Sequence, residues 1–305
     1  MKFIYTFLFV FAFAKAVPAQ SYVDLVKINY ATVINAGYEG SDAETNVRLF
    51  DISLTYPIKL NEQTAIVTGL DYSNQMVDLF PTGMEETTLS SLTFKAGVSI
   101  KHSDRWSGTY LLLPKIASED LETGSEALFL GGLVLMKYQK TAGMQYRFGA
   151  YATSEGFGTL LTPILGMYYQ SENRHWEATL NLPINGDINY TVNEASRLGF
   201  NFQAPVRSYT IDAGGNAANY VQANLIEVGP YLEHSFAKES IRLRFQVGYS
   251  SVSYEVFDAN ETLPFRLAAF EFGDDRNRLN PDMNGNLFLR VGAIYRFQLE
   301  TNPEE

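Results

Sequence analysis

Apolar and polar residues alternate one by one over most of the chain, from Leu25 to Phe297. The alternation is clearest in residues 26–34, 50–59, 92–100 and 241–249, where every second side chain is apolar and those between are largely polar or small. A repeat of two residues is typical of a β-strand with one apolar and one wetter face. It predicts an all-β protein, and it fits a soluble β-sandwich as well as a membrane barrel.

Strand length and aromatic content favour the membrane barrel. Several expected strands exceed ten residues, whereas strands of soluble proteins usually have about five or six. The chain has 21 Phe and 19 Tyr. Aromatic residues near strand ends on the apolar face suit the interfacial girdle of a membrane barrel, although the core of a sandwich would also hold them. The candidates are Tyr30, Tyr56, Tyr72, Tyr138, Tyr169, Trp176, Tyr249 and Tyr295.

The connections between the expected strands alternate in length. Tight polar turns are expected at residues 61–63, 102–105, 141–143, 171–174 and 237–240. Longer connections are expected at residues 37–43, 75–88, 118–126, 154–159, 211–219 and 258–285. Short turns at the periplasmic end and long loops at the other end are the arrangement of bacterial membrane barrels. This pattern predicts an antiparallel up-and-down barrel and sets the direction of every strand.

The strand number depends on residues 176–193, which keep one unbroken phase of alternation. One long strand here would give thirteen strands, an odd number that single-chain bacterial barrels avoid. A hairpin around residues 183–186 gives fourteen, and Pro183, Asn185 and Gly186 are typical turn residues. A three-residue connection preserves the phase, whereas a two-residue turn reverses it. We therefore expect 12–14 strands, with fourteen preferred.

The last expected strand carries a recognisable pattern. In residues 286–297 apolar and wetter positions alternate, and the strand ends with Arg290, Gly292, Tyr295 and Phe297. This spacing resembles the C-terminal recognition strand of bacterial outer-membrane β-barrels, which the insertion machinery reads. Residues 298–305 follow it, whereas the family signal usually closes the chain. The resemblance implies a barrel in the outer membrane of a Gram-negative bacterium, with membrane lipid and the insertion machinery as partners. The whole pattern also resembles uncharacterised (domain of unknown function) barrel families of Bacteroidota.

The N-terminal segment has the features of a secretory signal peptide. Lys2 precedes an apolar stretch at residues 3–14, and small residues at 17–19 suit a cleavage site after Ala19. An uncleaved membrane anchor is the alternative, but Lys15 interrupts the apolar stretch before it reaches the roughly 20 residues that a spanning helix needs. We expect residues 1–19 to be removed and residues 20–305 to form a single barrel domain.

Composition excludes several kinds of partner and site. The chain has no Cys, so it has neither disulfides nor a lipid attachment site. It has 34 acidic and 23 basic residues, a net charge of −11, and nucleic-acid binding needs a basic face. His102, His175 and His234 fall in or near tight turns at the periplasmic end, where solvated residues are the simpler interpretation. We therefore expect no enzyme activity and no cofactor.

Acidic residues occur in the expected long loops. Carboxylates can hold calcium, but these loops lack the regular spacing of a dedicated calcium loop. Charged, solvated loops are the simpler interpretation, and we predict no metal site. The residues concerned are Glu39, Asp42, Glu44, Glu119, Asp120, Glu122, Asp274, Asp275 and Asp282.

The wetter strand faces carry the candidate site. A Lys or Arg at the bilayer midplane costs about 2–4 kcal/mol, so basic residues within the strands are expected to face the lumen. They are Lys27, Lys95, Arg147, Arg197, Arg242, Arg244, Arg290 and Arg296. Possible acidic partners are Asp51, Asp71, Glu177, Glu227 and Glu233. Two interpretations stay open: a basic stripe that favours anions, or a salt-bridge network that fills a narrow lumen.

One region is apolar on both strand faces. Its expected inward residues are Leu111, Leu113, Phe129, Leu133 and Leu135, and its outward residues are Tyr110, Leu112, Leu130, Val134 and Met136. The segments are too short for membrane helices, so doubly apolar strands are expected. Either a plug or folded-in loop covers the inner residues, which we favour, or the lumen holds an apolar ligand.

These features lead to a main functional hypothesis and two alternatives. The main one is a passive channel for small solutes, with a possible preference for anions and an unknown solute. The first alternative is a non-conducting barrel with a structural or surface-display role. The second is a transporter of hydrophobic molecules, which the apolar inner region motivates. A fold alone does not choose between them.

Overall fold

The computed structural model describes residues 22–81, 86–119, 121, 124–211, 219–237 and 239–298. The expected signal peptide and residues 299–305 lie outside these ranges, as do Asp120 and Glu122. Within the described ranges, no helix has the length and apolar character that a transmembrane helix needs.

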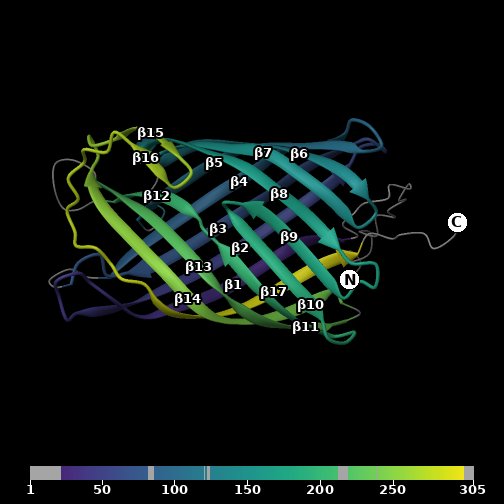
Figure 1. Ribbon diagram of the computed structural model, residues 1–305. Helices are drawn as coiled ribbons and strands as arrows, with labels where there is room; N and C mark the ends of the chain where they lie inside the picture. The colour runs from purple at the N-terminus through teal and green to yellow at the C-terminus, as the bar shows by residue number, and fades with distance from the viewer. Residues whose placement is uncertain are drawn as a thin grey trace, which may run out of the picture.

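The described chain forms one 17-stranded sheet that closes on itself (Figure 1). The barrel wall consists of β1 (Tyr22–Gly37), β2 (Glu44–Lys59), β3 (Thr64–Val77), β4 (Thr87–Lys101), β5 (Trp106–Glu119), β6 (Leu128–Thr141), β7 (Met144–Glu155), β8 (Gly158–Gln170), β9 (Trp176–Leu182), β10 (Asn185–Thr191), β11 (Ser196–Gln203), β13 (Asn219–Phe236), β14 (Ile241–Asp258) and β17 (Asn286–Gln298). These fourteen strands are antiparallel to their neighbours in the wall, and β17 closes the barrel against β1. Three further strands are β12 (Val206–Ile211), β15 (Leu263–Leu267) and β16 (Phe270–Phe272).

The predicted architecture and strand number are confirmed. In the decisive segment, β9 and β10 form a hairpin in which Asn181 pairs with Asn185. Three residues intervene, so the side-chain phase continues: Leu182 and Ile188 face outward, while Glu177 and Asp187 face the lumen. Tight turns join the strands at one end of the barrel, here called the turn end, and the long connections lie at the other, the loop end (Figure 1). The longer connection expected at residues 154–159 is wrong, because only residues 156 and 157 separate β7 from β8.

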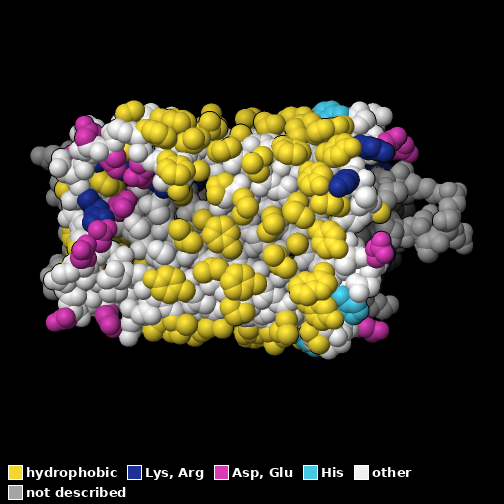
Figure 2. Space-filling view, in the orientation of Figure 1, with side chains coloured by type: hydrophobic (Ala, Val, Ile, Leu, Met, Phe, Trp, Pro, Cys, Tyr) yellow, Lys and Arg dark blue, Asp and Glu magenta, His cyan; other side chains and the backbone are white. Residues whose placement is uncertain are grey.

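The outer surface of the barrel is an apolar band, which excludes the soluble sandwich. Leu112 is 63% exposed, Leu130 62% and Leu165 65%, and Figure 2 shows apolar side chains along the whole wall that faces the viewer. Aromatic side chains pair near the turn end, with ring centroids 5.0 Å apart for Trp106 and Tyr138 and for Trp176 and Tyr190. The apolar face of each strand points outward, because its polar face is satisfied by water or ion pairs in the lumen.

The interior of the loop end is a packed hydrophobic core around β12. Strands β11 and β12 both pair with β13 in one continuous register, and Ala204 and Pro205 separate them. Strand β12 then forms a one-residue parallel bridge to β5 on another part of the wall, between Thr210 and Ser118. Tyr209 and Ile211 point to one side of β12, into a cluster with residues of β1, β2, β13 and β14. We call this cluster the loop-end core.

Candidate functional site

The lumen at the turn end is lined by charged side chains, as the sequence predicts. Lys95, Arg147, Arg242, Arg290 and Arg296 are buried behind the wall. The side chains of Arg197 and Arg244 are 13% and 18% exposed, and that of Lys27 is 46% exposed. All eight basic candidates occupy the face opposite the apolar band.

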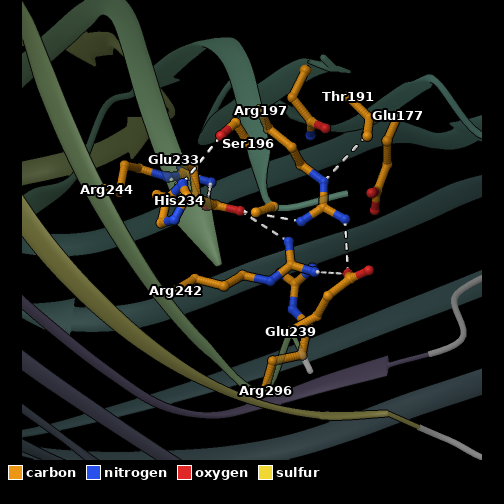
Figure 3. Close-up of polar contacts among 12 residues, drawn as sticks. Glu177, Thr191, Ser196, Arg197, Glu233, His234, Glu239, Arg242, Arg244 and Arg296 are labelled. Carbon is orange, nitrogen blue, oxygen red and sulfur yellow. Dashed lines mark hydrogen bonds and ion pairs between the residues drawn. The ribbon is translucent and has the colours of Figure 1, made fainter. Parts of the chain in front are cut away.

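Glu233 on β13 is the centre of the largest charged group (Figure 3). Its carboxylate accepts hydrogen bonds from Arg242 Nη1 at 2.9 Å and from Arg244 Nη2 at 2.7 Å, and Arg197 Nη1 lies 3.6 Å away. Strand register explains this geometry, because Glu233 is paired with Arg244 on one neighbouring strand and with Arg197 on the other. Arg197 and Arg242 also converge on Glu239, each at 3.0 Å.

Arg244 extends this group to β10. Its Nη1 lies 2.7 Å from Oδ2 of Asp187, whose other oxygen accepts a hydrogen bond from the Tyr231 hydroxyl at 2.7 Å. The guanidinium carbon of Arg244 stacks 3.7 Å from the centroid of the Tyr231 ring. The ring has space there because the facing residue is Gly199, where a Cβ atom would lie 2.2 Å from Tyr231 Cζ. Together with Glu233, Glu239 and their arginines we call this the Glu233 network.

A second group crosses the lumen from β1. Arg296 Nε lies 2.5 Å from Asp24 Oδ1, Lys27 Nζ lies 3.0 Å from Asp24 Oδ2, and the Arg296 guanidinium stacks on the Tyr22 ring at 3.4 Å. The Tyr22 hydroxyl donates a hydrogen bond to Glu177 on β9. Since β17, β14, β13, β11 and β10 separate β1 from β9 along the wall, this contact joins non-neighbouring parts of the barrel.

The remaining basic candidates also have polar partners. Arg290 Nη2 lies 2.6 Å from Glu227, and Lys95 Nζ lies 2.7 Å from Asp71. Arg147 donates a hydrogen bond to Asn181 at 3.3 Å. Seven of the eight basic candidates therefore lie beside a carboxylate, which largely cancels the field that an unpaired basic stripe would produce, whereas Arg147 contacts an amide.

The doubly apolar region is only partly covered. Phe129 packs into the loop-end core with Tyr209 and Ile211 of β12. The other predicted inward residues lie nearer the turn end and are half-buried. Leu111 leans over Gly97, and Leu135 leans over Gly149, where added Cβ atoms would lie 2.9 and 3.1 Å from the leucine Cδ atoms. The wall beside β12 therefore keeps an apolar strip that faces the lumen.

A comparison of the sequence with protein families identifies the chain. The family described as Domain of unknown function (DUF6268) matches residues 16–292. The chain belongs to the DUF6268 family. The sequence pattern predicted a resemblance to outer-membrane barrels of unknown function, and this prediction is confirmed. No curated protein matches this DUF6268 chain.

Two solved structures illustrate what the chain is similar to. The DUF6268 barrel is similar to the COG4313 outer membrane channel from Pseudomonas putida F1, with a TM-score of 0.45, 10% identity, and coverage of 89% of this chain and 93% of that chain. It is also similar to the NanC porin, with a TM-score of 0.36, 8% identity, and coverage of 88% and 98%. At these identities the likeness concerns the barrel architecture.

The sequence pattern missed several carboxylates of the DUF6268 site. Asp24 lies before a register shift between Asp24 and Val26, which hides its inward orientation. Glu239 belongs to a turn, where alternation carries no information about direction. Asp187 does stand in the polar phase of residues 176–193, so the signal for it was present, but its partner Arg244 is distant in sequence.

The other chemical candidates lie outside this lumen network. His234 Nδ1 lies 3.1 Å from the Ser196 hydroxyl, and His175 Nδ1 lies 2.9 Å from the backbone oxygen of Thr191, both at the turn end. His102 Nε2 lies 3.0 Å from the Tyr110 hydroxyl on the outer surface. Over the part of the chain that the structure describes, no three His, Asp or Glu side chains gather in a way that could hold a metal ion.

Proposed function

We propose that this protein is an outer-membrane channel that conducts small polar solutes when β12 moves out of the lumen. The apolar outer band suits hydrocarbon, and the charged and amide side chains of the turn end suit a hydrated path. The observation that carries the proposal is the position of β12. It lies between this polar lumen and the loop end, and it is bridged to β5 through one residue pair, Thr210 and Ser118.

The paired charges argue for weak selectivity. A basic stripe attracts anions only when its field is not cancelled at short range. Each guanidinium of the Glu233 network has a carboxylate at 3.6 Å or closer. We therefore expect the channel to select by size and to show at most a small preference for anions.

A disulfide across the lumen tests the role of β12. The chain has no Cys, so the double variant Ser118→Cys/Thr210→Cys introduces the sole thiol pair at two bridged positions. Directly paired strand positions suit the Cα separation that a disulfide requires. In planar bilayers the oxidised variant should stop conducting, and a reductant should restore the conductance of the unmodified protein.

The single variants Ser118→Cys and Thr210→Cys serve as matched controls, because each has the substitution without the crosslink. Equal conductance of the oxidised and reduced double variant would show that β12 does not control passage. If the unmodified barrel never conducts over a wide range of voltage, the channel proposal fails and the non-conducting barrel replaces it. Outer-membrane fractionation and heat-modifiable gel migration test the proposed location.

Reversal potentials test the selectivity. Neutralising Arg242, Arg244 and Arg290 together should shift the permeability ratio toward cations, because Glu233, Asp187 and Glu227 lose their counter-charges. Glu233→Gln should shift the ratio toward anions, because it leaves arginines with less compensation. A strong anion preference in the unmodified protein, lost in the triple variant, would instead support an anion-selective stripe.

A further inference from the structure

The wall of the barrel is incomplete above the β9–β10 hairpin. Strands β9 and β10 have 7 residues each, whereas β8 has 13 and β13 has 18. Strand β8 pairs with β9 only from Leu165 onward. On this edge, the segment of β8 that lies toward the loop end is therefore not paired with β9. On the other side of this gap, β12 stays paired with β13, but its other edge bridges to β5 across the lumen and, in the described chain, has no pairing with β8.

Strand β12 is held inside the lumen from several directions. Ser208 donates two hydrogen bonds to Glu155 at the end of β7, while Arg207 donates one to Ser73 on β3 at 2.8 Å. Arg207 and Tyr209 on one side of β12 therefore face β3 and the loop-end core. Val206 and Ser208 on the other side face the end of β7 and the start of β8, next to the wall gap.

The β15–β16 hairpin, residues Leu263–Phe272, covers the gap from outside (Figure 1). Strand β15 runs parallel to β8, with backbone hydrogen bonds from Leu263 to Phe157 at 2.7 Å and from Ala268 to Leu161 at 2.8 Å. At the opposite edge, β16 reaches β13 through side chains, with Gln222 Nε2 donating to Glu271 at 2.9 Å. One edge of the hairpin is thus held by backbone hydrogen bonds, and we call it the backbone seam. The other edge is held by side-chain contacts, and we call it the side-chain seam.

The hairpin has the two faces of a membrane wall. Phe270 and Phe272 are 70% and 51% exposed on the outside, whereas Leu263 and Arg266 are buried on the inside. Arg266 Nη1 lies 2.9 Å from Glu271 Oε1. Aromatic residues of this exposure suit the hydrocarbon or its interface. The hairpin therefore fills the place of the missing wall strands. On its β13 side it is not joined to the barrel by backbone hydrogen bonds of the sheet.

The base of the hairpin is fixed independently of its tip. Asn277 donates hydrogen bonds to the Glu261 carboxylate from its backbone N at 3.2 Å and its Nδ2 at 3.0 Å. Arg276, whose side chain is 1% exposed, donates to the Tyr220 hydroxyl and to Gln222, each at 3.0 Å. These contacts hold the rim of the barrel while the hairpin between them has its own weaker seam.

The interior directly behind the hairpin is packed mainly with apolar side chains. Phe157, Leu160 and Leu263 form a cluster against which Tyr151 and Val206 pack. Toward the turn end, the half-buried strip of Leu111, Leu113, Leu133 and Leu135 continues along β5 and β6. An apolar surface thus extends from the wall gap toward the open lumen, past the buried Lys115–Glu155 pair.

We propose that the β15–β16 hairpin is a lateral door through which small apolar molecules pass between the lumen and the membrane. On one side of β12, the loop-end core closes the route along the barrel axis. On the other side of β12, the gap in the wall offers a shorter exit to the membrane. The inference rests on the proposed channel function, since a lateral door needs a lumen that leads to it. The side-chain seam between Gln222 and Glu271 is the edge that opens.

Thiol labelling tests this route, because the natural chain has no Cys. Leu133→Cys places a thiol on the lumen face of β6, and Leu130→Cys on the same strand places one on the outer face, where Leu130 is 62% exposed. The barrel is reconstituted in phosphatidylcholine vesicles that contain a phospholipid with a maleimide on its acyl chain. The thiol at position 130 should react rapidly with the lipid-borne maleimide, and the thiol at position 133 should react slowly.

Weakening the seam should accelerate the lumen reaction. Glu271→Ala removes one of the two carboxylates that Gln222 Nε2 contacts, as well as the ion-pair partner of Arg266 and Arg276. We expect it to raise the labelling rate at position 133 several-fold while the rate at position 130 stays unchanged. Glu271→Gln keeps an acceptor for Gln222 and is the matched control. A second variant replaces residues 263–272 with a short Gly-Ser linker, and heat-modifiable migration verifies its folding.

Two outcomes would overturn the door. In one, neither variant changes the rate at position 133 although both barrels are folded. In the other, the variants raise the labelling rate of a charged water-soluble maleimide as much as that of the lipid-borne reagent, which would mean that they opened an aqueous leak. Conductance of the same proteins keeps the two proposals separate, because a barrel can conduct through its lumen while position 133 stays inaccessible from the lipid.

Discussion

Ser208 of β12 and Glu155 of β7 are joined by two hydrogen bonds to the same carboxylate oxygen, one from the Ser208 backbone N at 2.8 Å and one from its hydroxyl at 2.7 Å. The other Glu155 oxygen accepts a hydrogen bond from Lys115 Nζ at 2.6 Å. A buried carboxylate thus holds a strand that has left the wall and compensates a buried ammonium group. This contact makes Glu155 a link between the barrel wall and the segment that closes its lumen.

Glu155→Ala should destabilise the barrel strongly. Removing one partner of a buried ion pair typically costs about 3–5 kcal/mol, because the remaining charge stays buried without compensation. The midpoint of unfolding in urea, followed by heat-modifiable migration, measures the effect. Asp104→Asn is the control, since Asp104 pairs with Lys101 on the exposed surface, and its midpoint should stay within error of the unmodified protein. A midpoint unchanged by Glu155→Ala would contradict the inferred role of this pair.

Gly199→Ala should disturb the Glu233 network. The new Cβ atom would lie 2.2 Å from Tyr231 Cζ, so the ring must move away from Asp187 and Arg244. Overpacking of this kind costs about 1–3 kcal/mol. Gly124→Ala is the matched control, because no atom lies within 4 Å of the position that its Cβ would take. Urea unfolding of both variants tests the difference, and equal midpoints would argue against a close Gly199–Tyr231 contact.

Charge substitutions on the outer surface should depend on depth. Leu165→Arg, in the middle of β8, should cost about 2–4 kcal/mol of folding free energy in a bilayer, because the guanidinium would face hydrocarbon. Leu60 is 58% exposed beside the turn after β2, and Leu60→Arg should cost about 0–1 kcal/mol near the interface. Reversible folding into phosphatidylcholine vesicles measures both. Similar costs at the two positions would contradict a membrane-spanning apolar band.

The long loop after β14 should stay docked until strongly acidic pH. Hydrogen bonds from Arg276 lower the pKa of Asp274 from 3.8 to about 2. A carboxyl with a lowered pKa in the folded state contributes stability above its unfolded pKa and loses it as the pH falls through the folded value. Cleavage of this loop by pepsin should therefore be slow at pH 4 and accelerate toward pH 2.

Asp274→Asn removes the carboxylate whose protonation is expected to release the loop. In the same pepsin assay, the loop of this variant should be cleaved faster than that of the unmodified protein already at pH 4. Asp104→Asn is again a suitable control, because Asp104 has a lowered pKa through Lys101 but lies at the turn end, far from the loop. Cleavage rates of the Asp274 variant that match the unmodified protein at every pH would contradict the docking role of Asp274.

The sequence by itself determined the wall of this barrel. Alternation sorts each residue between hydrocarbon and lumen through a local energetic preference, so it predicted the outward positions of Leu112 and Leu130. The continuous phase of residues 176–193, combined with Pro183 and Gly186, was enough to predict the fourteen-stranded count. The roles of the eight basic candidates and of the terminal pattern from Arg290 to Phe297 stay predictions.

Only the tertiary structure decided which strands leave the wall. Residues 206–211 alternate like any wall strand, and nothing in their period distinguishes pairing with β10 from a path across the lumen to β5. The β15–β16 hairpin lies in a segment that the sequence indicated only as a long loop. Its position depends on the edge of β8 that the short β9 leaves unpaired. Unsatisfied backbone groups and interior volume are properties of the closed barrel, and a local pattern carries no record of them.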